Sequence, residues 1–202
     1  SQAPLARALA AATPLVVLCN PNNPTAGTLS AAALLDAAAQ LQRRGGWLIV
    51  DEAFGDATPD NCVTALAGGP AAPNLIVLRS LGKFFGLAGA RVGFVFGARE
   101  KLDLLREAIG PWPLSGPARA VARQALADTA WQQRTRGELI AASARLAALL
   151  APFGGVQACA LFATVATPQS VALYEHLARQ AILTRHFPAH GLLRFGLPGS
   201  EA

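Results

Sequence analysis

The sequence predicts an α/β fold: a mainly parallel sheet with helices on both faces, followed by a smaller C-terminal α+β domain. In the first half, short apolar runs bounded by turn residues alternate with helical patterns, which is typical of parallel strands joined by crossover helices. After residue 110 longer helical stretches and paired strands replace this alternation. We therefore expect residues 1–110 to form part of a larger domain. Residues 111–202 should form a linker helix and a small, truncated C-terminal domain.

Four short apolar segments predict the strands of the first domain, because each is bounded by turn residues and is too short for a typical helix. Between the first two, Ser30 is expected to cap a helix that runs to about Arg44 and stops at Gly45 and Gly46. The predicted strands are residues 15–19, 47–50, 74–78 and 91–96.

The second domain begins after the stiff segment Pro111-Trp112-Pro113. Ser115-Gly116-Pro117 suits a helix start with the proline near the first helical position, and the helical pattern continues to Leu150 with a break near Asp128. Beyond it we expect a strand pair over 156–165, a helix over 169–179 and strands near Ile182 and Leu193.

Composition narrows the class of protein. The 202 residues are 52% hydrophobic and 14% charged, and no run of about 18 strongly apolar residues predicts a membrane helix. The segment Ser1-Gln2-Ala3-Pro4 lacks the charged and apolar regions of a signal peptide. We therefore expect a cytoplasmic protein without membrane association. Because the chain contains no Met, we also expect it to be a piece of a longer polypeptide.

The net charge of +5 is compatible with nucleic acid, but the arginines are scattered and form no basic stripe interleaved with aromatic residues. A site for an anionic small molecule accounts for the excess equally well. Cys19, Cys62 and Cys159 are too widely spaced to suggest a disulfide framework or a zinc site. We expect neither a nucleic-acid partner nor a bound metal.

The basic residues are nearly all arginine: of 17, only Lys83 and Lys101 are lysine. Arginine stays protonated in proteins, whereas a desolvated lysine can lose its proton and become a nucleophilic amine. Lys83 follows a predicted strand closely, so it is the first candidate for a chemical role.

Polar motifs follow the predicted strands in a definite order, and in parallel sheets ligands bind beyond the carboxyl ends of the strands. The motifs are Asn20–Gly27, Asp51–Phe54, Ser80–Lys83 with Arg91, and Leu193–Pro198. They resemble those of class I/II aminotransferases, which are pyridoxal-5′-phosphate (PLP) enzymes of fold type I, and the resemblance covers essentially the whole chain. The most similar subgroups are histidinol-phosphate aminotransferases and, more particularly, threonine-phosphate decarboxylases of cobalamin biosynthesis. Against that family we expect the N-terminal part and the last helix to be missing.

The resemblance implies roles for five residues around the cofactor. Lys83 would be the catalytic lysine that holds PLP covalently. Asp51 would keep the pyridine nitrogen protonated, and Asn23 would donate a hydrogen bond to the ring oxygen. Ser80 and Arg91 would hold the phosphate through a hydroxyl and a guanidinium.

The resemblance also implies a substrate site. Arg194 would grip the substrate α-carboxylate as a bidentate fork, and Arg185 is a weaker candidate for a substrate phosphate. Two departures from the family motifs stand out: Ala26 is interposed before Gly27, and Phe54 replaces a common tyrosine.

Motifs shared by the whole family do not choose the reaction, because the orientation of the bonds at the substrate Cα decides it. The expected activity is decarboxylation of L-threonine O-3-phosphate, with transamination of a histidinol-phosphate type substrate as the alternative. A non-catalytic fragment and a PLP-binding regulator fused to a DNA-binding domain are the other readings. The expected partners are a small phosphorylated amino acid and a second copy in a homodimer.

Overall fold

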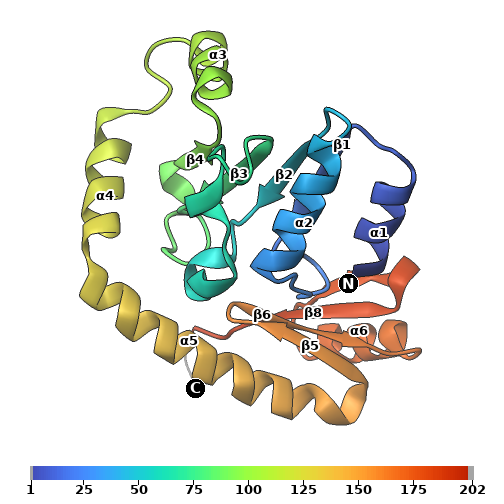
Figure 1. Ribbon diagram of the computed structural model, residues 1–202. Coiled ribbons are helices and arrows are strands. Elements are labelled where there is room, and N and C mark those ends of the chain that lie inside the picture. The colour runs from blue at the N-terminus through green and yellow to red at the C-terminus, as the bar shows by residue number, and fades with distance from the viewer. Residues whose placement is uncertain (1, 200–202) are drawn as a thin grey trace. The chain divides into compact units, whose positions relative to one another are not determined.

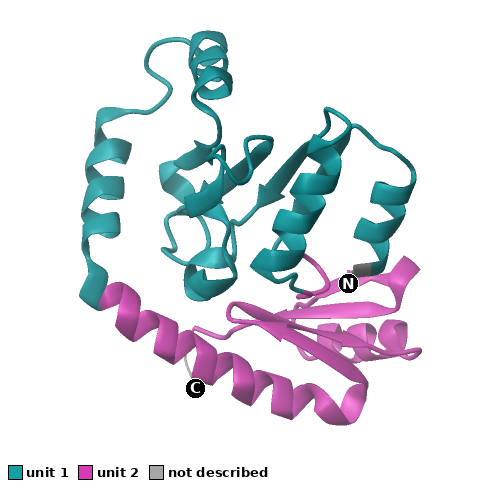
Figure 2. Cartoon of the chain, viewed as in Figure 1, with its two compact units in different colours: residues 1–21, 28–130 teal, residues 22–27, 131–202 magenta. Residues whose placement is uncertain are grey.

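The computed structural model describes residues 2–199, which form two compact units (Figure 2). The first unit runs to residue 21 and resumes from 28 to 130. The second takes the short segment 22–27 and continues from residue 131. Each unit has its own sheet, so each is described by itself.

The first unit is built on a four-stranded sheet whose strands lie in chain order (Figure 1). β1, β2 and β3 are parallel, and β4 pairs with β3 antiparallel. The predicted mainly parallel sheet is therefore confirmed. The last strand reverses because residues 81–92 contain no crossover helix, which a parallel connection requires. The strands are β1 (Leu15–Cys19), β2 (Trp47–Asp51), β3 (Leu75–Ser80) and β4 (Gly93–Phe96).

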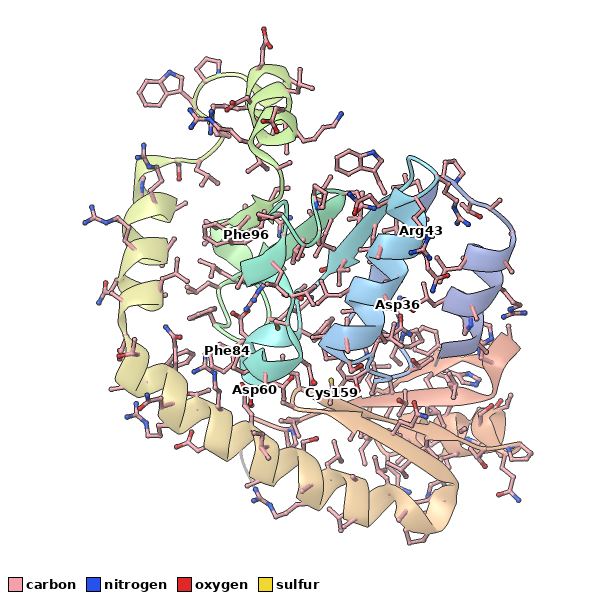
Figure 3. All side chains as sticks on the ribbon, viewed as in Figure 1. Asp36, Arg43, Asp60, Phe84, Phe96 and Cys159 are labelled. Atoms are coloured by element: carbon pink, nitrogen blue, oxygen red, sulfur yellow. The ribbon has the colours of Figure 1, made fainter. Side chains whose placement is uncertain are left out.

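Two helices, α1 (Gln2–Ala10) and α2 (Ala31–Gln42), pack on one face of this sheet. As predicted, Ser30 caps α2, with its hydroxyl accepting from the Ala33 N–H at 3.2 Å. Asp36 lies on the exposed side of α2 (Figure 3). The core of the unit combines apolar residues of α2 with alternate residues of the strands: Val16, Leu34, Ala37, Ala38, Leu41, Leu48, Val50, Val63, Ala72, Leu75 and Val77.

The opposite face of β1 is not covered by a helix within residues 2–199. Leu15 is 47% exposed and Val17 62% exposed there, so the predicted second helical layer does not extend over this strand. Short 3₁₀ turns fill the β2–β3 and β3–β4 connections, and two helices follow β4. These elements are η1 (Gly55–Ala57), η2 (Pro59–Asn61), η3 (Thr64–Leu66), η4 (Ala88–Ala90), α3 (Arg99–Ile109) and α4 (Gly116–Ala127).

The second unit has an antiparallel sheet in the order β5-β6-β8-β7. The end of the long helix α5 packs on it, with Leu150 against Ala163 and Val165 in a small core. The predicted strand near Ile182 lies three residues later. The elements are α5 (Thr129–Leu150), η5 (Ala151–Phe153), β5 (Gly155–Cys159), β6 (Phe162–Ala166), α6 (Ser170–Arg179), β7 (Arg185–Phe187), η6 (Pro188–His190) and β8 (Leu192–Gly196). Within residues 2–199, none of the helices combines the length and hydropathy needed to cross a membrane.

Candidate active site

The carboxyl ends of β1, β2 and β3 meet at one edge of the first unit's sheet, because these strands are parallel. Cys19 and Asp51 are direct register partners at this edge, and Ser80 is the last residue of β3. Two of the predicted site residues, Asp51 and Ser80, are thus brought together from positions 29 apart by strand pairing. This is where open α/β sheets bind ligands.

Asp51 is half-buried, and its carboxylate is oriented by two neighbours. Oδ1 accepts from the Ala53 N–H at 2.9 Å, and Oδ2 lies 4.0 Å from Cys19 Sγ. Burial, and to a smaller degree the Asp51 carboxylate, raises the pKa of the Cys19 thiol. That thiol therefore stays protonated at neutral pH.

Lys83 lies in the turn that follows β3, and its side chain is exposed. Two backbone bonds close the turn: Gly86 N–H donates to Lys83 O and Leu87 N–H to Leu81 O, both at 3.0 Å. The next residue, Phe84, is buried (Figure 3) and anchors the turn. The Nζ atom of Lys83 lies 5.4 Å from the centroid of the Phe54 ring. The buried Phe84 thus fixes the backbone from which the exposed Lys83 side chain extends.

Ser80 and Arg91 line the same cavity, of about 180 Å³, which opens between the end of β3 and the start of β4. Ser80 Oγ accepts from the Gly82 N–H at 3.1 Å. Arg91 has a left-handed backbone (φ 54°) and donates from Nη1 to Ala88 O at 3.1 Å. A Cβ on Gly82 would lie 3.2 Å from Ser80 Oγ and 3.4 Å from Ala88 Cα, so glycine keeps the cavity open. A hydroxyl, a backbone amide and a guanidinium around such a space suit a phosphate group.

Asn23 belongs to the second unit, in a tight loop between β1 and α2. The loop is closed by Asn22, whose N–H donates to Gly27 O and whose carbonyl accepts from the Ala26 N–H, both at 2.8 Å. Ala26, the residue interposed in the family motif, is buried with a left-handed backbone at φ 57°. Asn23 itself is exposed at the tip of the loop.

Arg194, on β8 of the same unit, is half-buried and hydrogen-bonds through Nη1 to Asn23 Oδ1. Its guanidinium carbon also lies 5.2 Å from the centroid of the Phe162 ring. The bond uses the amide oxygen of Asn23, which leaves its NH₂ group as the end that can donate to a ligand. Arg185 is exposed and is the register partner of Arg194 across β7 and β8. Two guanidinium groups thus start from adjacent positions on one sheet.

The predicted residues therefore fall into two sets. Asp51, Ser80, Lys83 and Arg91 lie around one edge of the first unit, whereas Asn23, Arg185 and Arg194 lie in the second. Sequence reasoning missed residues that support both sets.

Three supporting residues stand out. Asn20 is 2% exposed and ties Leu29 across the loop that carries Asn23. Glu52 is fully buried, and Arg79 pairs with it. Glu52 directly follows the predicted site residue Asp51, and Arg79 directly precedes Ser80. Each is a charged residue at the end of an otherwise apolar segment, and this pattern could have identified both.

The other thiol of the first unit, that of Cys62, is unreactive at neutral pH. Burial, followed by the nearby Glu52 carboxylate, raises the pKa of the Cys62 thiol to about 12. Among the described residues 2–199, no three His, Cys, Asp or Glu side chains gather closely enough to hold a metal ion. Because its thiol stays protonated, Cys62 is a weak nucleophile at neutral pH.

Solved structures share this fold. A histidinol-phosphate aminotransferase from Sinorhizobium meliloti, solved in complex with pyridoxal-5′-phosphate, is 24% identical with a TM-score of 0.78, over 96% of this chain and 56% of the other. A decarboxylase from Sulfurospirillum multivorans is 22% identical with a TM-score of 0.81, over 98% of this chain and 60% of the other. At these identities the likeness establishes the fold alone.

Sequence relatives are closer. A threonine-phosphate decarboxylase from Pseudomonas aeruginosa is 50% identical over 190 residues, which is 93% of this chain and 56% of the relative. Another from Sinorhizobium is 41% identical over 98% of this chain and 59% of the relative. A histidinol-phosphate aminotransferase from Sodalis glossinidius is 43% identical over 60% of this chain and 33% of the relative. The chain thus spans somewhat more than half the length of the two decarboxylases.

The sequence profile of one protein family, aminotransferase class I and II, matches residues 3–202. The match includes every candidate residue of both units and agrees with the parallel sheet and its polar carboxyl edge. The chain belongs to the aminotransferase class I and II family.

Proposed function

We propose that this chain carries the PLP site of an enzyme that decarboxylates L-threonine O-3-phosphate. The observation that carries the cofactor assignment is the placement of Asp51 and Ser80 at one sheet edge, with Lys83 in the turn that directly follows. PLP needs a carboxylate for its ring nitrogen, donors for its phosphate and an amine for covalent attachment. The edge offers each of these groups.

The residues of the first unit fit this cofactor. The cavity lined by Ser80 and Arg91, of about 180 Å³, supplies a hydroxyl and a guanidinium for the phosphate. Asp51 supplies the carboxylate, held in orientation by the Ala53 N–H. Lys83 supplies the exposed amine. When bound there, PLP supplies an electron sink for a bond broken at the substrate Cα.

The second unit supplies substrate contacts in this proposal. Arg194 holds the α-carboxylate, and its bond to Asn23 links that grip to the residue proposed to contact the cofactor ring oxygen. Arg185, its register partner, is placed for a second anionic group, the substrate phosphate. After the loss of CO₂, Lys83 would donate the proton that replaces the carboxylate at the former Cα, and the product would be 1-amino-2-propanol phosphate.

The choice of substrate is supported by the 50% identity to a threonine-phosphate decarboxylase over 93% of this chain. The runner-up is transamination of histidinol phosphate or a related amino acid, favoured by relatives such as the Sodalis enzyme at 43% identity. Both substrates carry a phosphate, so an arginine pair serves either. The two reactions differ in the bond at the substrate Cα that is oriented for cleavage: the bond to the carboxylate in decarboxylation and the C–H bond in transamination.

The cofactor assignment is tested by mixing the purified protein with PLP, reducing with borohydride and mapping the modified peptide by mass spectrometry. We expect a pyridoxyl group on Lys83, and none in Lys83→Ala. Lys101→Ala is the matched control, because it removes the other lysine, whose amine lies 5.1 Å from the Trp47 ring at the far end of β2. A folded protein that gives no adduct would support the reading as a non-catalytic fragment.

The reaction is tested by supplying L-threonine O-3-phosphate and L-histidinol phosphate separately to the PLP-loaded protein. Release of CO₂ from the first supports the decarboxylase. Accumulation of pyridoxamine 5′-phosphate with the second supports the aminotransferase instead. Arg194→Ala should abolish either activity while the Lys83 adduct still forms.

We propose in addition that the protein acts as a homodimer, as the family resemblance implies, and that it is located in the cytoplasm. Sedimentation velocity of the PLP-loaded protein tests the first statement, and a monomer at micromolar concentration contradicts it. Cell fractionation tests the second.

A further inference from the structure

A buried ionic cluster lies directly behind the candidate cofactor residues of the first unit. Side chains of successive strand residues face opposite sides of a sheet, so Glu52 and Arg79 face away from their neighbours Asp51 and Ser80. They extend the buried rows Leu48–Val50 of β2 and Leu75–Val77 of β3, and they meet because Asp51 and Leu78 are register partners. The cluster therefore occupies the core face of the strand ends whose other face carries the candidate site.

The contacts within the cluster are directional. Glu52, fully buried, accepts through Oε1 from the Val63 N–H at 2.6 Å and through Oε2 from the Thr64 hydroxyl. Arg79 Nη1 donates to Thr64 Oγ1 at 3.1 Å and lies 3.4 Å from Glu52 Oε2. Its Nη2 pairs with Asp56. The Arg79 guanidinium thus connects the end of β3 to three residues of the segment that follows β2, namely Glu52, Asp56 and Thr64.

The stability of the fold does not by itself require an ion pair between Glu52 and Arg79 at this position. The Arg79 side chain is only 17% exposed and that of Glu52 is fully buried, and the lost solvation of such a pair can exceed its Coulomb energy. An apolar pair of similar volume could fill the same space. A planar fork with several partners differs from an apolar contact in fixing an orientation.

We propose that Arg79 is a positioning residue that fixes Ser80, and the cavity it lines, relative to Asp51. The inference rests on the proposed function, in which Asp51 and Ser80 contact opposite ends of one rigid cofactor. Asp51 is held independently, since β2 pairs with both β1 and β3 and the Asn20 N–H donates to Asp51 O at 2.9 Å. Ser80 ends its strand, where it pairs with Gly93 of the short strand β4, and among the described residues the charged side chain adjacent to it in sequence is Arg79. Loosening that anchor changes the spacing between the two ends of the site.

The test compares two cofactor forms, PLP and pyridoxal, which lacks the phosphate. In Arg79→Met we expect the dissociation constant for PLP to rise about tenfold or more, while that for pyridoxal changes less than about twofold. A general loss of structure would weaken both ligands alike. The matched control is Arg106→Met, which removes an exposed arginine paired with Asp103 at 2.6 Å and should change neither constant.

A double variant separates positioning from folding. Arg79→Met leaves Glu52 without its cation, so the free protein should unfold at lower urea concentration. Adding Glu52→Gln removes the unpaired charge and should restore most of the unfolding midpoint. We expect PLP binding to stay about tenfold weak in this restored protein.

The outcomes are distinct. If PLP affinity recovers together with the midpoint, or if PLP and pyridoxal weaken equally, Arg79 has only a structural role and the inference is wrong. If the wild-type protein forms the Lys83 adduct and Arg79→Met binds PLP equally well, the inference fails and the proposed function stands. If the wild-type protein forms no adduct, both fail.

Discussion

The side chain of Asn20 should hold the first loop of the candidate site closed, and Asn20→Ala measures how strongly. Asn20 is 2% exposed. Its Oδ1 accepts from the Leu29 N–H at 2.8 Å, and its Nδ2 donates to Leu29 O at 3.1 Å and Asn61 O at 3.4 Å. The amide therefore pairs with both backbone groups of Leu29, across the loop that includes Asn23.

The magnitude follows from these contacts. Alanine keeps none of them, and each of the two shorter bonds contributes about 1 kcal/mol, with a further cost for the unpaired Leu29 groups. The 3.4 Å contact adds little. We expect the free energy of unfolding to fall by about 2–3 kcal/mol, which corresponds to roughly 4–12 °C in Tm for a protein of this size. Urea unfolding with an unchanged m-value would measure it.

Two further variants sharpen this prediction. Asn22→Ala removes one bond, to Thr25 Oγ1 at 2.7 Å, from a partly exposed side chain and should cost less than about 1 kcal/mol. Asn20→Asp places a carboxyl against the carbonyls of Leu29 and Asn61, so its folded pKa should lie above the unfolded value of about 3.9. Its stability should then be highest below about pH 4 and fall as pH rises. A loss under about 0.5 kcal/mol in Asn20→Ala would refute the reasoning.

Other predictions follow from local geometry. Gly45 (φ 72°) and Ala181 (φ 60°) occupy equivalent left-handed positions after α2 and α6. Measured by urea unfolding, Gly45→Ala should therefore destabilise the protein by about 1 kcal/mol and Ala181→Gly should stabilise it by about 1 kcal/mol. Two effects of the same sign would contradict this reasoning. Because burial and Glu52 raise the pKa of Cys62 to about 12, the folded protein should lose stability as pH rises above about 9, a loss that Cys62→Ala should reduce. Iodoacetamide at pH 8 should likewise alkylate Cys62 more slowly in the folded than in the urea-unfolded protein. Leu34→Ala, in the core at 0% exposure, should cost about 3 kcal/mol, whereas Leu104→Ala, 59% exposed, should stay within about 0.5 kcal/mol.

Local features of the sequence determined most of the secondary structure. Ser30 caps α2 through its hydroxyl as predicted, and α4 starts after Ser115 as predicted, with the Ser115 hydroxyl as its cap, because a cap depends on residues three positions apart. The break near Asp128 separates α4 from α5 as predicted. The helices α1 and α3 were not predicted. α3 has no buried residue, although Leu102, Leu105 and Ile109 recur at helical spacing, so an apolar stripe was available in its sequence as a signal.

The sequence also identified the polar carboxyl edge, because strand ends and turn residues are local properties and parallel strands bring them to one side. It did not place Arg79 against Glu52, or Arg194 against Asn23 across 171 residues. Those contacts depend on strand register and on folding of the small sheet, which only the tertiary structure decides. The direction of β4 is of the same kind, since a strand pattern carries no sign of whether its neighbour runs parallel or antiparallel. Periodicity thus specifies which residues are buried, whereas their partners are set by the packing of distant segments.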